Sequence, residues 1–164
     1  MKSKQTVILL LTMLGLSLSA AESTNRLSFP VAGFSIAPLE VPPAKNIWQP
    51  LAMALPATGN FAGNVNVQIH PYGGTIEEYT ALSLKQFKDA GVHVIEQKKA
   101  GSSGVTFEYS GELQGRLIHF YARAEKGADH VYLATAATTE QEWPRQRAQL
   151  KTCVDSLRCE NSKP

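Results

Sequence analysis

The chain has 164 residues, of which 43% are hydrophobic and 18% charged, with 16 basic and 14 acidic side chains. Such a composition is typical of a globular protein, and a chain of this length forms one domain of ordinary size. A charge so close to balance excludes the strong basic field of proteins that bind nucleic acid or anionic membranes.

The first 21 residues have the three parts of a secretory signal peptide. Lys2 and Lys4 form a positive start, an apolar run follows over residues 7–18, and Ser19–Ala21 offers the small side chains that a signal peptidase recognises. The apolar run has about 12 residues, whereas a membrane-spanning helix needs ~20. We therefore expect cleavage after Ala21, export to the bacterial periplasm or beyond, and no membrane span in the mature protein.

Removal of the signal peptide leaves residues 22–164 as a single expected domain. This mature chain keeps 14 of the 16 basic residues and all 14 acidic ones, so its net charge is zero with neutral histidines. A chain of this size buries one core without a structural metal or many disulfides. The charge balance again gives no reason to expect a nucleic-acid partner.

The beginning of the mature chain shows few signals of regular structure. Residues 22–32 are polar and predict a loop, whereas 33–38 (GFSIAP) predict a short strand. Prolines are frequent over 38–50 and exclude a regular element there. Within that segment Ile47 and Trp48 form an apolar pair, which either tucks under the sheet or anchors a partner.

Two strands and an amphipathic helix are expected next. Residues 51–55 predict one strand, and strict alternation of apolar and polar side chains over 64–69 predicts another. Thr75 and Glu78 have the spacing of a capping box, and Gly91 is suited to end the helix that they begin. The preceding Gly73-Gly74 resembles an anion-binding turn, but the acidic first turn of the helix favours a plain cap.

Four strands and a second helix complete the chain. The strands are expected over 92–98, 104–110, 116–124 and 128–137, and their short glycine-containing connections predict antiparallel pairing. Thr139 and Glu142 form a second possible capping box, followed by an apolar helical stripe of Trp143, Leu150, Val154 and Leu157. The order β-β-β-α-β-β-β-β-α predicts an α+β fold.

This succession resembles the PsbP-like fold. The features that carry the resemblance are the GFSI strand, the NVNVQI strand that turns into a TIEEY helix, a V-x-V strand, a glycine-bounded meander and a C-terminal helix, together covering about residues 29–157. Photosystem II PsbP, the Ran-binding Mog protein and the exported bacterial protein DcrB share this fold, and the similarity is greatest to proteins of the DcrB kind. The resemblance implies an α/β/α sandwich around an antiparallel sheet, and binding or assembly rather than catalysis.

No catalytic or metal-binding motif stands out in the sequence. The four histidines, His70, His93, His119 and His130, lack the close spacing of metal pairs, and His130 is expected opposite Ala122 if the hairpin turn centres on Lys126. His119 is expected to share one strand face with Tyr121 and Arg123. Residues 101–104 (GSSG) lack the last glycine and the following helix of a nucleophile elbow, so they predict a polar turn.

The only two cysteines, Cys153 and Cys159, lie in the exported part of the chain and are expected to form a disulfide. Six residues apart on one helix they would be too far from each other to bond, so the helix must end between them. The alternative is two separate thiols.

Two classes of function remain open. The first is a periplasmic, non-enzymatic binding or assembly module that needs no cofactor, has an envelope protein as its unknown partner, and uses Ile47 and Trp48 as candidate anchors. The second is a hydrolase whose catalytic residues come from distant positions. An enzyme would bring histidine and carboxylate side chains together in a deep pocket, whereas a binding module would present a shallow apolar surface.

Overall fold

The computed structural model describes residues 26–39 and 45–159. The expected signal peptide, 1–21, and its cleavage point lie outside these residues. The described chain falls into two compact units, residues 1–40 and 41–164, and each is taken by itself.

The first unit is a small β-hairpin made of β1 (Leu27–Phe29) and β2 (Phe34–Ile36). Its apolar residues lie opposite one another, and the stacked rings of Phe29 and Phe34 are 4.9 Å apart. The loop predicted over 22–32 is therefore wrong for its last part, because Leu27–Phe29 forms a strand. A three-residue strand is too short to show the alternation that identifies longer ones.

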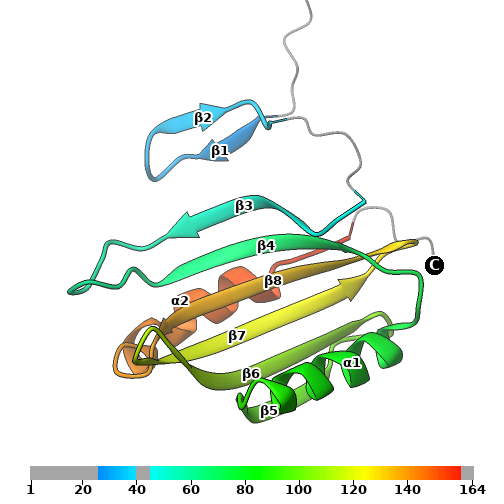
Figure 1. Cartoon of the computed structure of the whole chain (residues 1–164). Coiled ribbons are helices and arrows are strands. Elements are labelled where there is room, and N and C mark those ends of the chain that lie inside the picture. The colour runs from blue at the N-terminus through cyan, green and yellow to red at the C-terminus, as the bar shows by residue number, and fades with distance from the viewer. Residues whose placement is uncertain (1–25, 40–44, 160–164) are drawn as a thin grey trace, which may run out of the picture. The chain divides into compact units, whose positions relative to one another are not determined.

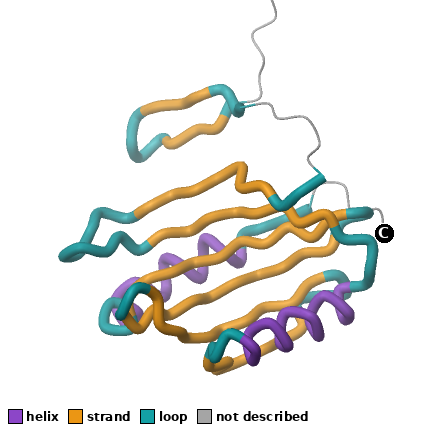
Figure 2. Tube along the Cα trace, in the orientation of Figure 1, coloured by secondary structure: helices purple, strands orange, loops and turns teal. Residues whose placement is uncertain are grey.

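The second unit is a six-stranded antiparallel sheet with two helices (Figures 1 and 2). The strand order across the sheet is β3-β4-β8-β7-β6-β5, so β3 and β5 are its edges. The elements are β3 (Trp48–Ala54), β4 (Asn64–Pro71), α1 (Ile76–Asp89), β5 (His93–Lys99), β6 (Gly104–Leu113), β7 (Arg116–Lys126), β8 (His130–Thr139) and α2 (Trp143–Asp155).

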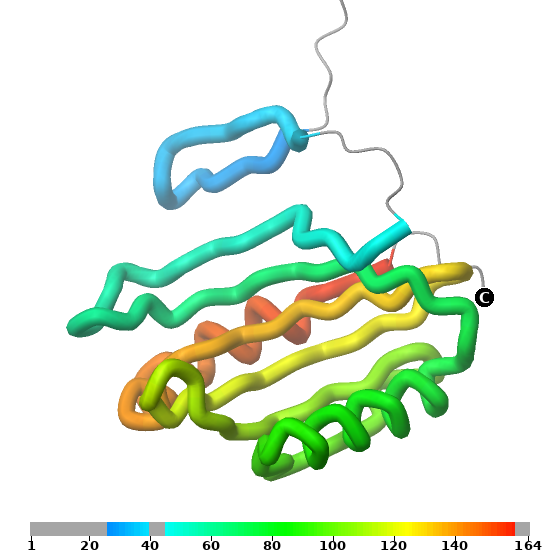
Figure 3. Tube along the Cα trace, viewed as in Figure 1, coloured from blue at the N-terminus to red at the C-terminus, as the bar shows by residue number. Residues whose placement is uncertain are grey.

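The two helices cover opposite faces of this sheet, which Figure 3 shows along the chain trace. Alternation along the central strand β7 decides the assignment, because neighbouring residues of a strand point to opposite faces. Tyr121 packs with Trp143 and Leu150 of α2. Ala124 packs with Ile76 and Tyr79 of α1. The expected α/β/α sandwich around an antiparallel sheet is therefore confirmed.

Helix α1 begins and ends as the sequence predicted. The Glu78 amide donates to Thr75 Oγ1 over 3.2 Å, and the Thr75 amide donates to Glu78 Oε2 over 2.8 Å, which completes the capping box. Gly91 follows the helix with a φ of 68°, a left-handed conformation that glycine adopts without a steric penalty. The turn before α1 is thus a helix cap, as the acidic first turn indicated.

Helix α2 begins three residues later than predicted. Thr139 Oγ1 does accept a hydrogen bond from the Glu142 amide, at 3.3 Å, but this closes a turn before the helix. Glu142 itself is the N-cap, and Pro144 lies in the first helical turn, where proline costs no hydrogen bond. Trp143, Leu150 and Val154 are buried as expected.

Two smaller expectations about the strands are wrong. The β7–β8 hairpin pairs Ala122 with Thr135, so His130 lies beyond the paired end of β7 and pairs with Pro71 of β4 instead. The proline-rich segment gives way to β3 already at Trp48, and Pro50 lies at a β-bulge between Trp48 and Leu51. Proline is tolerated there because an edge strand does not need every backbone donor. Within the described residues, none of the helices has the length and apolar character needed to cross a membrane.

Candidate functional site

A buried histidine lies between helix α2 and the sheet. His119 projects from β7 toward α2, is 3% exposed, and stacks on the indole of Trp143 with ring centroids 4.0 Å apart. Its neighbour two residues on, Tyr121, points to the same face, as the sequence indicated. A flat contact of two rings at the start of α2 fixes where the helix meets the sheet.

Both ring nitrogens of His119 contact carboxylates. Nδ1 lies 2.9 Å from Glu140 Oε2, and Nε2 lies 3.1 Å from Glu108 Oε1. Ionised carboxylates only accept hydrogen bonds, so both contacts are hydrogen bonds when both ring nitrogens carry hydrogen. The histidine thereby links three parts of the chain, namely strand β6, strand β7 and the turn that leads into α2.

Helix α2 contributes a lysine to the same cluster. Lys151 Nζ donates to Glu108 Oε2 over 2.9 Å and lies 4.1 Å from the centre of the Tyr121 ring. Burial alone would raise the pKa of Glu108, but hydrogen bonds from Lys151 and His119 and their charges outweigh it, so the pKa is below its usual value. We call these four residues, Glu108, His119, Glu140 and Lys151, the charged cluster.

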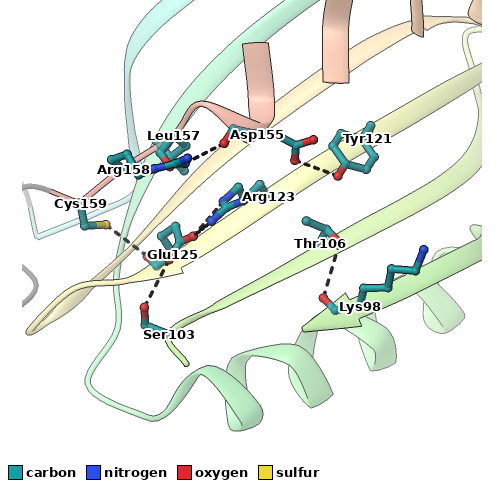
Figure 4. A network of polar contacts seen from close by, with 10 residues as sticks. All are labelled: Lys98, Ser103, Thr106, Tyr121, Arg123, Glu125, Asp155, Leu157, Arg158 and Cys159. Atoms are coloured by element: carbon teal, nitrogen blue, oxygen red, sulfur yellow. Dashed lines mark hydrogen bonds and ion pairs between the residues drawn. The ribbon is translucent and has the colours of Figure 1, made fainter. Parts of the chain in front are cut away.

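Polar contacts continue along the same face toward the end of α2 (Figure 4). The Tyr121 hydroxyl donates to Asp155 Oδ1 over 2.9 Å. Arg123 pairs with Glu125, and Ser103 Oγ lies 3.4 Å from Glu125 Oε2. In the figure Tyr121, Arg123 and Glu125 project from one side of β7, so every second residue from His119 to Glu125 takes part in a polar contact.

The chemistry of these groups favours a structural role. His119 is buried, and both of its nitrogens are occupied by carboxylates, so neither is available to take a proton from a substrate. Burial and the hydrogen bond to Asp155 raise the pKa of Tyr121 to about 12, which keeps the phenol neutral. Throughout the described residues each buried side-chain nitrogen and oxygen has a hydrogen-bond partner. The same part of the chain contains no group of three His, Cys, Asp or Glu side chains able to hold a metal ion.

A recess opens between edge strand β3 and helix α2, away from the charged cluster. Its volume is about 150 Å³. We call it the β3–α2 recess, and its lining residues are Met53, Ala54, Leu55, Asn64, Val65, Gln149, Leu150 and Cys153. A second hollow shares Leu55 and Gln149 with it and continues past Arg145 toward the start of α2. The lining of the recess carries no charged side chain, which favours an apolar occupant.

The two predicted anchor residues lie at the start of β3. Ile47 is 60% exposed, and Trp48 is half-buried, opposite Ile69 of β4. Trp48 is therefore neither in a loop nor in the closed core. Because partners in an antiparallel pair point to the same face, Trp48 lies on the α2 side of the sheet, as do Leu51 and Met53.

The two cysteines do not form the predicted disulfide in the structure. Helix α2 ends at Asp155, between them, as the prediction required. However, Cys153 packs against the apolar cluster under α2, whereas Cys159 Sγ lies 4.0 Å from the Glu125 carbonyl oxygen. Burial raises the pKa of both thiols, so neither is activated as a nucleophile. Pairing in the exported protein stays a prediction, which thiol titration of denatured, unreduced protein tests.

Sequence reasoning grouped His119, Tyr121 and Arg123 correctly but missed the partners of His119. Glu140 lies in a turn and Lys151 on a helix, so no fixed spacing connects them with the histidine. One signal was present in β6, where Thr106, Glu108 and Ser110 alternate with apolar residues and mark a polar strand face.

Comparisons with known proteins show the fold and little more. No family model matches the chain, and no curated protein sequence is significantly similar to it. A Pseudomonas aeruginosa protein of unknown function, PA94, has a solved structure with 16% identity and a TM-score of 0.57, covering 85% of this chain and 96% of that one. The solution structure of cyanobacterial PsbP from Synechocystis matches with 17% identity and a TM-score of 0.42, over 64% and 79% of the two chains.

The similarity to PA94 agrees with the α+β fold that the sequence indicated. At such identities a likeness between structures concerns the fold, and one fold serves many functions. The fold therefore does not assign a function to this chain.

Proposed function

We propose that this protein is an exported bacterial protein, of the kind that DcrB represents, which acts in the periplasm as a non-enzymatic binding module for another protein. The proposal of export rests on the leader-like residues 1–21, with their positive start, apolar run and small residues before the expected cleavage point. A zero net charge in the mature chain favours recognition by shape and apolar contact over long-range attraction.

The observation that carries the proposal is the β3–α2 recess. It lies beside an edge strand whose α2-facing side chains, Trp48, Leu51 and Met53, are only half-buried. These side chains keep apolar surface exposed to water, and burying that surface at an interface is favourable. Such a strip of apolar residues is what a partner protein can bury.

The charged cluster supports the same class of function. A hydrolase needs a base that can reach a substrate, and His119 is enclosed by Trp143 and by two carboxylates. Its contacts instead attach α2 to the sheet. A rigid position for α2 matters to a binding module, because α2 forms one wall of the recess.

In-cell photo-crosslinking tests the binding surface. A photoreactive amino acid replaces Gln149, an exposed residue of the recess on α2, or Lys88, an exposed residue of α1, in the tagged full-length chain. We expect a discrete adduct with an envelope protein from position 149 and none from position 88. Adducts of equal yield from both positions, or turnover of a defined substrate by the purified protein, would contradict the proposal.

The proposed export has its own test. The intact mass of the protein recovered from the periplasm is expected to equal that of residues 22–164. Retention of residues 1–21 would remove the basis for a periplasmic role.

A further inference from the structure

The β3–α2 recess lies beside a strand edge that has no neighbour among the described strands. β3 pairs with β4 on one side, and it ends the sheet on the other. An edge strand presents a row of backbone N–H and C=O groups that can pair with another extended segment. The recess and this edge share Met53 and Ala54, so a segment paired with β3 would have its side chains beside the recess.

The free edge is short. Regular pairing with β4 covers Leu51–Ala54, because the bulge and Pro50 interrupt β3 before Leu51. Proline has no backbone N–H to offer, so Pro50 also limits pairing on the outer edge. A stable dimer interface buries about 1,200–2,000 Å², and pairing two copies over four residues each falls far short of that area. The edge therefore fits a short peptide segment better than a second copy of this chain.

The charges around the recess decide the kind of segment. No charged side chain lines the recess itself. The hollow that adjoins the recess has one charged lining residue, Arg145, which is paired with Glu142 at 2.5 and 2.9 Å from its guanidinium nitrogens. A charged side chain placed here would lose its hydration without gaining a partner. A cavity of about 150 Å³ accommodates a benzene-sized apolar group.

We propose that an extended, uncharged segment of a partner protein pairs with β3 at Leu51–Ala54 and places one aliphatic or aromatic side chain in the β3–α2 recess. Backbone hydrogen bonds to β3 supply affinity for any extended segment, and the recess selects which side chain the segment carries, as in other cases of strand addition. The proposal rests on the proposed binding function, and it names the mode of binding and the class of ligand.

The test uses a random heptapeptide library displayed on phage and selected on the mature protein, residues 22–164. We expect enriched peptides to be uncharged, rich in β-branched residues, and to share one Leu, Met, Ile or Phe position. The tightest peptide, synthesised with both ends capped, is then titrated by calorimetry. Hydrogen exchange is expected to slow in β3 when the peptide is bound, and to stay unchanged in β5, the opposite edge strand.

Two matched variants locate the peptide. Gln149→Trp fills the recess from an exposed position of α2, and we expect it to lower the affinity at least about tenfold. Ala148→Trp adds the same ring at the adjacent exposed position, which lies about 100° further around the helix, and should change the affinity less than about twofold. Equal effects of the two variants, charged consensus peptides, or unchanged exchange in β3 would each overturn the proposal.

Two further outcomes would overturn the proposed strand addition. Failure to enrich any peptide overturns strand addition, and so does a dimer in analytical ultracentrifugation that Gln149→Trp dissociates, because a second copy would then occupy the edge. If the in-cell adduct from position 149 forms in either case, the binding function stands and only this mode of binding falls.

Discussion

The two faces of the sheet are built differently, although each is covered by one helix. Under α1 the contacts are mainly between apolar and aromatic side chains, with Phe87 edge-on to Phe107 at 5.5 Å and Tyr72 edge-on to Tyr79 at 5.3 Å. A neutral polar contact joins the Tyr79 hydroxyl to His70 Nδ1 at 3.1 Å. Under α2 an apolar cluster adjoins the charged cluster of Glu108, His119, Glu140 and Lys151. Apolar burial is non-directional, whereas hydrogen bonds fix direction. We infer that the α1 face supplies stability and the α2 face fixes a helix position.

The largest effect is expected from the α1 face. Phe107→Ala removes a ring that is 2% exposed and leaves a cavity between α1 and the sheet. We expect the free energy of unfolding to fall by about 4 kcal/mol, measured by urea denaturation. Leu82→Ala, on the exposed side of the same helix, is the control and should cost less than about 1 kcal/mol. A small loss for Phe107→Ala would refute the idea that stability resides in this face.

The second largest effect is expected from the charged cluster. His119→Ala removes the ring beneath Trp143, leaves Glu140 without its contact to the ring, and leaves Glu108 with Lys151 alone. Loss of one partner from a buried charged network destabilises strongly, and we expect a cost of about 3 kcal/mol. His93→Ala, at an exposed position of β5, serves as the control with little change. If His119→Ala is instead neutral, the cluster does not hold α2 to the sheet.

The contrast between the faces also explains what could be predicted from the sequence. The α1 face follows simple periodicity, since Ile76, Tyr79 and Phe87 recur at helical spacing and the cap is marked by Thr75 and Glu78. Those features were predicted correctly. The charged cluster depends on a turn residue, Glu140, and on the register between β6 and β7, and neither has a local sequence signal.

The start of α2 and the recess were missed for related reasons. Thr139 and Glu142 fit a capping box, yet Thr139 closes a preceding turn, and the helix begins at Trp143, whose ring stacks on His119. The recess is lined by residues of β3, β4 and α2, so it depends on how the helix packs against the sheet edge and has no local sequence signal. Sequence patterns identified Ile47 and Trp48 as apolar residues outside the core pattern. In the structure Trp48 begins the edge strand that borders the recess, and Ile47 comes directly before that strand.

A pH experiment sharpens the comparison from the α2 side. The pKa of Glu108 is lowered in the folded protein, so its ionised form stabilises the fold at pH values above its unfolded pKa of 4.5. That contribution is lost as the pH falls below 4.5 and passes through the folded pKa. Relative to the wild type, Glu108→Gln should cost about 1 kcal/mol at pH 7 and nothing at pH values where Glu108 is protonated. Urea denaturation at both pH values measures this.

Glu112 lies in the same strand, is exposed, and makes no side-chain contact in the charged cluster, so Glu112→Gln is the matched control. We expect no pH-dependent difference between this control and the wild type. A cost of Glu108→Gln that persists in acid would mean that packing, and not charge, is what the glutamate contributes.

The smallest effect on stability is expected at the edge of the sheet. Trp48 begins β3, is half-buried, and has one cross-strand neighbour, Ile69. Trp48→Ala therefore removes apolar area from the border of the α2 face without opening a closed cavity, and we expect a cost of about 1 kcal/mol or less, seen as a decrease of a few degrees in Tm. The adduct formed from position 149 in cells should nevertheless weaken severalfold, because a hot-spot aromatic contributes more to an interface than to the fold that presents it. Gln49→Ala, next to Trp48 on the same strand, is the control and should change neither the stability nor the adduct.

A cost of several kcal/mol for Trp48→Ala would instead assign this side chain to the core. The distinction between a stabilising α1 face and a binding edge on the α2 side would then fail at Trp48, the residue that the sequence first indicated as an anchor.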